Sequence, residues 1–128
     1  MTALNPLLDL CVGAMAIFTE RRLTAVTRLL QEDGFKVTIC HRGDEGLSRA
    51  SNADCDVVLT DLRLPGLGGL ELVKQLNESQ PRLPVVLMTA HGTIETAIEA
   101  TKLGAYDYLQ KPFEMPGLIS VLHRAVEA

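Results

Sequence analysis

Five short apolar segments alternate with longer segments of helical periodicity, and this alternation limits the fold more than any other feature of the sequence. Each apolar segment is continuously hydrophobic, which is typical of strands that are covered on both faces. Strands that alternate with helices predict a parallel sheet with helices on both sides. The predicted strands are Cys11–Phe18, Phe35–Cys40, Cys55–Thr60, Leu83–Thr89 and Tyr106–Leu109.

The segments between and after the strands predict five helices. Gly34 and Gly104 end two of them, as is common at helix C-termini, and Gly43–Asn52 predicts a weaker helix around Leu47 and Ala50. Because crossovers between parallel strands are right-handed, we expect an α/β fold with one doubly wound five-stranded parallel sheet. The apolar stripes of the other helices are Leu23, Val26, Leu29 and Leu30; Leu70, Val73 and Leu76; Ile94, Ala97, Ile98 and Thr101; and Leu118, Ile119, Leu122 and Val126.

Composition is that of an ordinary soluble globular domain, with 47% hydrophobic and 22% charged residues. The length of 128 residues suits one domain, and we expect a short leader over residues 1–10 and a single domain over 11–128. The net charge of −4 argues against direct contact with nucleic acid. The apolar run Leu10–Phe18 is too short to span a membrane, so we expect no membrane partner.

Three cysteines, Cys11, Cys40 and Cys55, lie within or beside apolar segments and show no spacing typical of a metal site. We interpret them as reduced thiols that pack as small hydrophobic side chains. Reduced thiols predict a cytoplasmic protein.

Polar side chains of complementary chemistry stand at the ends of three successive strands. Asp61 follows the third predicted strand, Thr89 ends the fourth and Lys111 follows the fifth. Ligands bind at the carboxyl ends of strands in open α/β sheets, so these side chains are expected to converge. A carboxylate can attack phosphorus, while an ammonium and a hydroxyl can contact phosphoryl oxygens. An acid at a strand end is more often a turn or cap residue, but the combination of three favours a phosphoryl-transfer site.

The sequence resembles the receiver domains of two-component response regulators over nearly its whole length. Three segments carry the resemblance: "DVVLTDLRLPGLGGLEL", "LPVVLMTAHGT" and "GAYDYLQKPF". Their residue pattern is similar to that of the NtrC-type branch. The resemblance implies a flavodoxin-like, CheY-like sheet of strand order 2-1-3-4-5. It implies Asp61 as phosphoacceptor, Thr89 and Lys111 as contacts to the phosphoryl group, and Tyr108 as the switch aromatic.

The resemblance also implies partners. A sensor histidine kinase would supply the phosphoryl group, and the fourth helix, fifth strand and fifth helix would form a homodimer face. NtrC-type regulators usually carry a sigma-54-activating ATPase and a DNA-binding domain after the receiver. We therefore expect signal transduction coupled to transcription, and no enzyme activity beyond self-catalysed phosphotransfer to Asp61.

The end of the first predicted strand departs from the family pattern. Receivers place two adjacent acids there, and the magnesium ion that these acids bind offsets repulsion between the phosphoryl group and the nucleophile. The expected positions are Ile17 and Phe18, or Phe18 and Thr19, and neither pair is acidic. The remaining ligands would be the Asp61 carboxylate and the backbone of Arg63. These two ligands are too few for a magnesium site. We therefore expect no cofactor here, although the resemblance to receiver domains implies Mg²⁺.

Glu20 is the carboxylate nearest to the expected pair. Threonine followed by glutamate also fits a helix start, which favours a first-turn position for Glu20 over metal binding.

Two functions of different classes follow from this departure. We favour an atypical receiver that works as a phosphorylation-independent interaction domain, with Lys111 paired directly to Asp61. The alternative is a conventional receiver that a histidine kinase phosphorylates on Asp61. A phosphatase with an aspartate nucleophile would want a second acid where the chain has Arg63.

Overall fold

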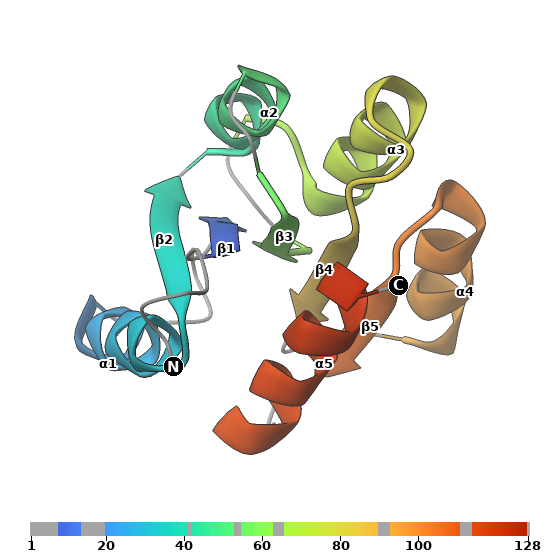
Figure 1. Ribbon diagram of the computed structural model, residues 1–128. Coiled ribbons are helices and arrows are strands. Elements are labelled where there is room, and N and C mark those ends of the chain that lie inside the picture. Colours follow the sequence, from blue (N-terminus) through green and yellow to red (C-terminus); the bar gives the residue numbers. More distant parts are fainter. Residues whose placement is uncertain are drawn as a thin grey trace.

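Five parallel strands form the centre of the computed structural model, which describes residues 8–13, 20–40, 42–52, 55–62, 66–89, 93–110 and 114–127. The strand order is β2-β1-β3-β4-β5 (Figure 1). The predicted doubly wound α/β fold and its strand order are therefore confirmed. The strands are β1 (Leu8–Gly13), β2 (Phe35–Cys40), β3 (Val57–Asp61), β4 (Val85–Thr89) and β5 (Asp107–Gln110). The helices are α1 (Glu20–Glu32), α2 (Gly43–Asn52), α3 (Gly69–Ser79), α4 (Ile94–Leu103) and α5 (Met115–Glu127).

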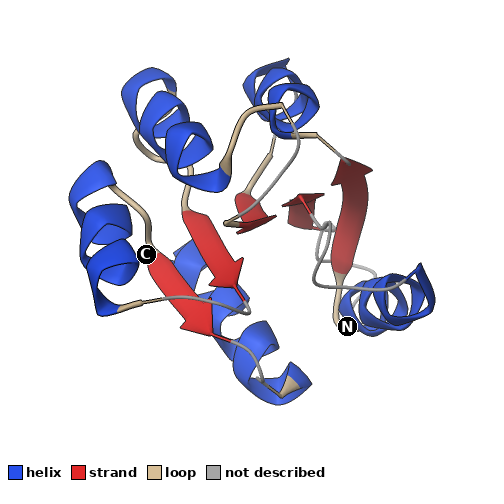
Figure 2. Cartoon of the chain, turned by 180° about the vertical axis from the view of Figure 1, so that it is seen from behind, coloured by secondary structure: helices blue, strands red, loops and turns tan. Residues whose placement is uncertain are grey.

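The helices cover the sheet in two layers. Helices α1 and α5 lie on one face, and α2, α3 and α4 lie on the other (Figures 1 and 2). Successive residues of a strand point to opposite faces. Accordingly, Val57 and Leu59 pack in the α1–α5 layer, whereas Val58 packs in the α2–α3–α4 layer. Burial on both faces is the reason why the strand sequences are continuously apolar.

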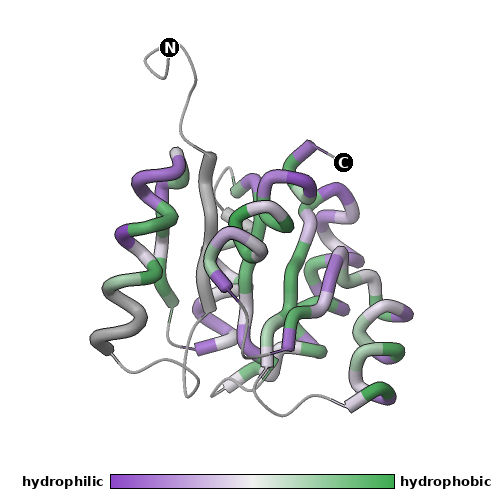
Figure 3. The backbone as a smooth tube through the Cα atoms, turned by 90° about the horizontal axis from the view of Figure 1, so that it is seen from below, coloured by the Kyte–Doolittle hydropathy of each residue, from purple (hydrophilic) through white to green (hydrophobic). Residues whose placement is uncertain are grey.

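Hydrophobic residues gather between the helices and the sheet, as the green stretches of the central strands in Figure 3 show. Every residue of β3 and β4 is buried. On the α1–α5 side, Leu30 of α1 shares one apolar cluster with Leu118 and Leu122 of α5. None of the helices in the described part of the chain has the length and apolar character needed to cross a membrane.

Two glycines end helices as predicted. Gly104 follows α4 with a φ of 106°, and Gly34 follows α1 with a φ of 99°. This left-handed conformation favours glycine, which has no Cβ. A side-chain hydrogen bond joins the end of α3 to α2: Gln80 Nε2 donates to the Ala50 carbonyl at 2.7 Å.

Neither Cys40 nor Cys55 forms a disulfide in the described part of the chain. Cys40 is buried at the end of β2, and this burial raises the pKa of its thiol. The Cys40 thiol is therefore protonated at neutral pH and packs as a small hydrophobic side chain, as predicted.

The first strand lies earlier in the sequence than predicted. The prediction was Cys11–Phe18, whereas β1 is Leu8–Gly13 and so begins inside the segment that we expected to be a leader. The physical reason is Asp9, which reads as a break in an apolar run but pairs in register with Lys36 of β2. The other four strands agree with their predictions to within two residues at each end.

Most of the apolar stripe predicted for α4 faces the surface rather than the sheet. Ile94 is 80% exposed and Ile98 is 51% exposed, while Ala100 is the buried residue of this helix. Thr101, also in the predicted stripe, is exposed. Helix α4 therefore turns Ile94 and Ile98 to the surface and packs on the sheet through Ala100 and the partly buried Leu103.

Adjacent leucines of α1 should differ strongly in their contribution to stability. Leu30 is completely buried and Leu29 is 41% exposed. We expect Leu30→Ala to lower the free energy of unfolding by about 2–5 kcal/mol, because it leaves a cavity in the α1–α5 layer. Leu29→Ala is the matched control and should cost less than about 1 kcal/mol. Urea denaturation measures both, and equal losses would contradict the packing of α1.

Candidate functional site

Asp61 is the last residue of β3, and only 1% of its surface is exposed. A buried carboxylate needs compensating charged or hydrogen-bonding groups, because desolvation disfavours its ionised form. Asp61 therefore differs from an ordinary turn residue, which would keep its carboxylate in water.

Thr89 ends β4 beside Asp61. In the β3–β4 register, Asp61 pairs with Met88, the residue before Thr89. The Leu62 N–H also donates to the Met88 carbonyl at 2.9 Å, which extends the contact past the end of β3. The Thr89 side chain is buried, at 2% exposure. The structure thus places a carboxylate and a hydroxyl at the ends of two adjacent strands.

Tyr108 lies on β5, on the same face of the sheet as Thr89. Its register partner on β4 is Leu87, and Leu87 and Thr89 point to the same side because strand residues alternate. Tyr108 packs against the α2–α3–α4 cluster, and its hydroxyl lies 2.9 Å from Thr96 Oγ1. The phenol therefore joins this part of the sheet to α4.

Close backbone packing holds the loop that follows Asp61. A Cβ on Gly69, the first residue of α3, would lie 2.5 Å from the Asp61 carbonyl oxygen. The Gly69 N–H donates to the Leu62 carbonyl at 3.0 Å. A Cβ on Gly43, the first residue of α2, would overlap the Leu67 carbonyl oxygen. The beginnings of α2 and α3 therefore both pack on this loop, in space that only glycine fits.

Several predicted site residues lie outside the described residues. They are Lys111, Arg63 and the positions Ile17, Phe18 and Thr19. The roles given to them above stay predictions.

Carboxylates are scarce around the end of β1. Gly13 ends β1 and pairs with Thr60, the residue before Asp61. The sequence has no acid between Asp9 and Glu20, and α1 begins at Glu20, in the first-turn position that we expected. Across the part of the chain that the structure describes, no group of three His, Cys, Asp or Glu side chains is placed to hold a metal ion.

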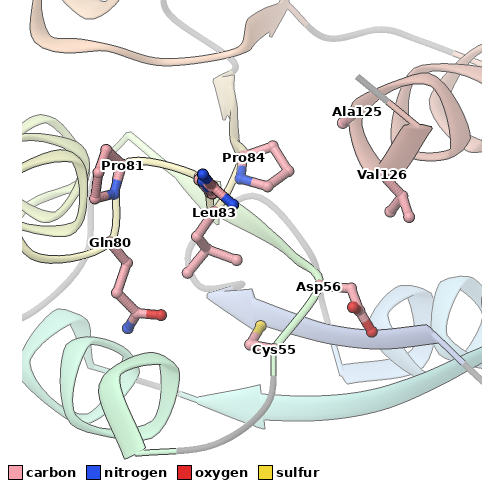
Figure 4. A pocket seen from close by; sticks show the side chains of 9 residues that line it. Cys55, Asp56, Gln80, Pro81, Leu83, Pro84, Ala125 and Val126 are labelled. Carbon is pink, nitrogen blue, oxygen red and sulfur yellow. The ribbon is translucent and has the colours of Figure 1, made fainter.

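A pocket lies at the opposite edge of the sheet. It is lined by Cys55 and Asp56 before β3, by residues 80–84 before β4, and by Ala125 and Val126 of α5 (Figure 4). These residues precede the strands that end at Asp61 and Thr89. The pocket is therefore separate from the candidate site.

A family model for the response regulator receiver domain matches residues 20–123. The chain belongs to the response regulator receiver family. The matched range includes Asp61, Thr89, Tyr108 and Lys111. It begins at Glu20, so β1 and the positions expected for the acidic pair lie before it.

Relatives of this receiver include transcriptional regulators. It is 39% identical over 99 residues to the DNA-binding transcriptional regulator NtrC of Salmonella typhimurium, a match that covers 77% of this chain and 21% of NtrC. The chain thus spans about a fifth of the length of the NtrC proteins that it matches.

Solved receiver structures share the fold. The beryllofluoride-activated NtrC4 receiver domain dimer has a TM-score of 0.81 and 25% identity, over 93% of this chain and 95% of that one. The receiver domain of the sensor histidine kinase PA1611 from Pseudomonas aeruginosa, with magnesium in its active-site cleft, has a TM-score of 0.82 and 23% identity. That match covers 95% of this chain and 99% of that one.

Adding one methyl group beside Asp61 should disturb this receiver. We expect Gly69→Ala to lower the free energy of unfolding by about 1–3 kcal/mol, because the new Cβ meets backbone rather than a flexible side chain. Gly68→Ala is the control, since nothing lies within 4 Å of its Cβ and its φ is −69°. Urea denaturation and the amide shift of Asp61 measure the effect. Similar behaviour of the two variants would contradict the close approach.

Proposed function

We propose that this receiver is an atypical, phosphorylation-independent interaction domain of two-component signal transduction. The observation that carries the proposal is the absence of any acid between Asp9 and Glu20, on either side of the end of β1. Magnesium in proteins usually has one or two carboxylate ligands in strict octahedral geometry. The donors left here are the Asp61 carboxylate and the backbone carbonyl of Arg63, and this set fits magnesium poorly.

Electrostatics connects the missing acids to the chemistry. A phosphoryl donor and the Asp61 carboxylate are both negative, so their approach is unfavourable without a cation between them. Lys111 is the cation that remains, and we propose that it pairs directly with Asp61. A carboxylate already held by an ammonium is a weaker nucleophile, because its charge is partly neutralised and the approach to it is restricted.

The alternative is a conventional receiver that is phosphorylated on Asp61. The burial of Asp61 and the position of Thr89 at the next strand end favour it, as does the match of the family model to the range that contains both residues. This alternative needs a further metal ligand, for which Glu20 is the nearest acid in sequence after β1.

The unmodified protein should react poorly with acetyl phosphate in the presence of magnesium. Restoring acids at the observed end of β1, with Gly13→Asp and Ala14→Asp, should increase the labelling rate by about 100-fold, because metal ions contribute several kcal/mol to charge stabilisation. Intact-mass spectrometry measures the added phosphoryl group. A parallel pair, Ile17→Asp with Phe18→Asp, tests the positions expected from sequence.

Two controls make this experiment decisive. Adding Asp61→Asn to each acidic variant should abolish labelling, which assigns the phosphoryl group to Asp61. Magnesium titration followed by amide shifts near Asp61 should show saturable binding in the acidic variant only. Labelling of the unmodified protein as fast as that of the acidic variants would instead support the conventional receiver.

We further propose that the receiver forms a homodimer through α4, β5 and α5. Three large apolar side chains are exposed on α4 and just before β5, and they are called the docking surface below: Ile94, Ile98 and Tyr106. Ile94 and Ile98 are four residues apart and so share one helix face. Exposed large apolar residues can mark interaction sites, and the NtrC4 receiver that this chain resembles is a dimer in its beryllofluoride-activated form.

The docking surface should mediate association without phosphate. We expect the untreated protein to dimerise, and Ile94→Glu with Ile98→Glu to raise the dissociation constant by about 30-fold or more, because central apolar contacts dominate interfaces. Leu29→Glu is the control, since Leu29 is 41% exposed on α1, away from this surface. Sedimentation equilibrium measures all three proteins. An untreated protein that stays monomeric at high micromolar concentration would contradict the dimer.

For the longer protein to which such a receiver would belong, we propose regulation of transcription through a sigma-54-type effector domain. The similarity to NtrC supports this role. A sensor histidine kinase is the partner expected for the alternative, conventional receiver. We propose a cytoplasmic location, no direct contact with nucleic acid by this domain, and no enzyme activity beyond phosphotransfer to Asp61.

A further inference from the structure

Helix α4 is attached to the sheet by less apolar burial than α3 or α5. Of its ten residues only Ala100 is buried. By contrast, α3 buries Leu72, Val73 and Leu76, and α5 buries three large aliphatic side chains and an alanine. Apolar burial is the main force that packs a helix on a sheet. Polar contacts must therefore decide a larger share of the position of α4.

A group of hydroxyls joins the start of α4 to β5. Thr93, the N-cap residue, accepts from the Thr96 N–H at 3.1 Å, and the Thr93 N–H donates to Thr96 Oγ1 at 2.9 Å. Thr96 Oγ1 also lies 2.9 Å from the Thr93 carbonyl oxygen and 2.9 Å from the Tyr108 hydroxyl. One side-chain oxygen therefore serves both the helix cap and the contact with the strand.

The donor and acceptor capacity of the Thr96 hydroxyl decides the direction of its hydrogen bond with Tyr108. A threonine hydroxyl donates one hydrogen bond and accepts two. The Thr93 carbonyl can only accept, so Thr96 donates to it, and the Thr93 N–H occupies one of the two acceptor positions. All three 2.9 Å contacts are hydrogen bonds together only when Tyr108 donates into the second position. The Thr93 hydroxyl, at 3.3 Å from Thr96 Oγ1, is the longest contact of the group.

We propose that the hydrogen bond from Tyr108 to Thr96 is the tether that positions the first turn of α4, and with it the docking surface. Thr96 is then a positioning residue: it holds the turn that begins with Ile94 without itself being a large apolar contact. The use of the surface for association rests on the homodimer proposed above, whereas the tether is a property of the single chain.

Residue-by-residue amide hydrogen exchange of the monomer tests the tether. Tyr108→Phe removes the donor but keeps the ring, and we expect the Thr96 and Ala97 amides to exchange about 2- to 10-fold faster, as expected for the loss of one net hydrogen bond. Thr96→Ser keeps the hydroxyl and should exchange like the unmodified protein. Thr101→Val is the matched control, because its hydroxyl donates within α4, to the Ala97 carbonyl at 2.9 Å.

A double variant separates the tether from general destabilisation. Once Thr96→Val has removed the acceptor, adding Tyr108→Phe should not accelerate the Ala97 amide further. Core amides such as Val73 and Leu87 should keep their rates in Tyr108→Phe. Unchanged α4 amides in Tyr108→Phe, or an equal acceleration throughout the protein, would overturn the proposal.

Association provides the second measurement. Tyr108→Phe should weaken the dimer by a factor similar to the acceleration of the α4 amides. A dimer of unchanged strength, despite faster α4 exchange, would overturn the link between tether and surface. An unmodified protein that stays monomeric would refute the homodimer, and the exchange data would still decide whether the tether exists.

Discussion

The burial of one carboxylate at the end of β3 is the constraint on which the rest of this site depends. A parallel sheet brings the carboxyl ends of its strands to one edge, and helices cover both of its faces. Asp61 lies at this edge and is buried. Gly69 approaches the Asp61 backbone closely, and Gly43 approaches Leu67. The glycines at the beginnings of α2 and α3 thus follow from the need to hold the surroundings of one buried acid.

Helix α4 follows a different rule from the other helices on its face. Helix α3 is fixed by aliphatic side chains that fill the space beside β3 and β4, so small perturbations at the sheet edge have little effect on it. Helix α4 is fixed by Ala100, by the partly buried Leu103 and by hydroxyl groups. A hydrogen bond depends on angle as well as on distance, whereas apolar burial is non-directional. The orientation of a neighbouring polar side chain therefore matters more for α4 than for α3.

The fold was predictable from the sequence because both faces of the sheet are buried. Because both faces are buried, β2, β3 and β4 have continuously apolar sequences. The polar residues at the ends of the strands then indicated which edge of the sheet carries the candidate site. The first strand was misplaced because Asp9 resembles the end of a strand, although its backbone lies within β1, in register with Lys36 of β2. The pairing of two strands leaves no trace in local periodicity.

The orientation of α4 could not be read from its sequence for a related reason. Ile94 and Ile98 have the spacing of a buried stripe, and periodicity alone does not say whether such a stripe meets the sheet or another molecule. The small Ala100 gave no comparable signal, although it is the residue that packs. The bond between Tyr108 and Thr96 was also invisible, because it joins residues of separate elements whose polar groups could equally face water.

Charge balance explains how a receiver could lose its acids and still keep Asp61. In the usual pocket three carboxylates face one lysine, and a divalent cation is needed to offset the excess negative charge. With both acids gone, one carboxylate faces one ammonium in the proposed pairing with Lys111, and no cation is required. Loss of a single acid would leave an excess charge and an incomplete metal site together. With the proposed pairing, replacing Asp61 as well would leave Lys111 without its counterion, which costs more than keeping the pair. The proposed pairing would therefore favour retention of Asp61 without phosphorylation, so the presence of Asp61 is weaker support for phosphorylation than the presence of the acids that bind the metal.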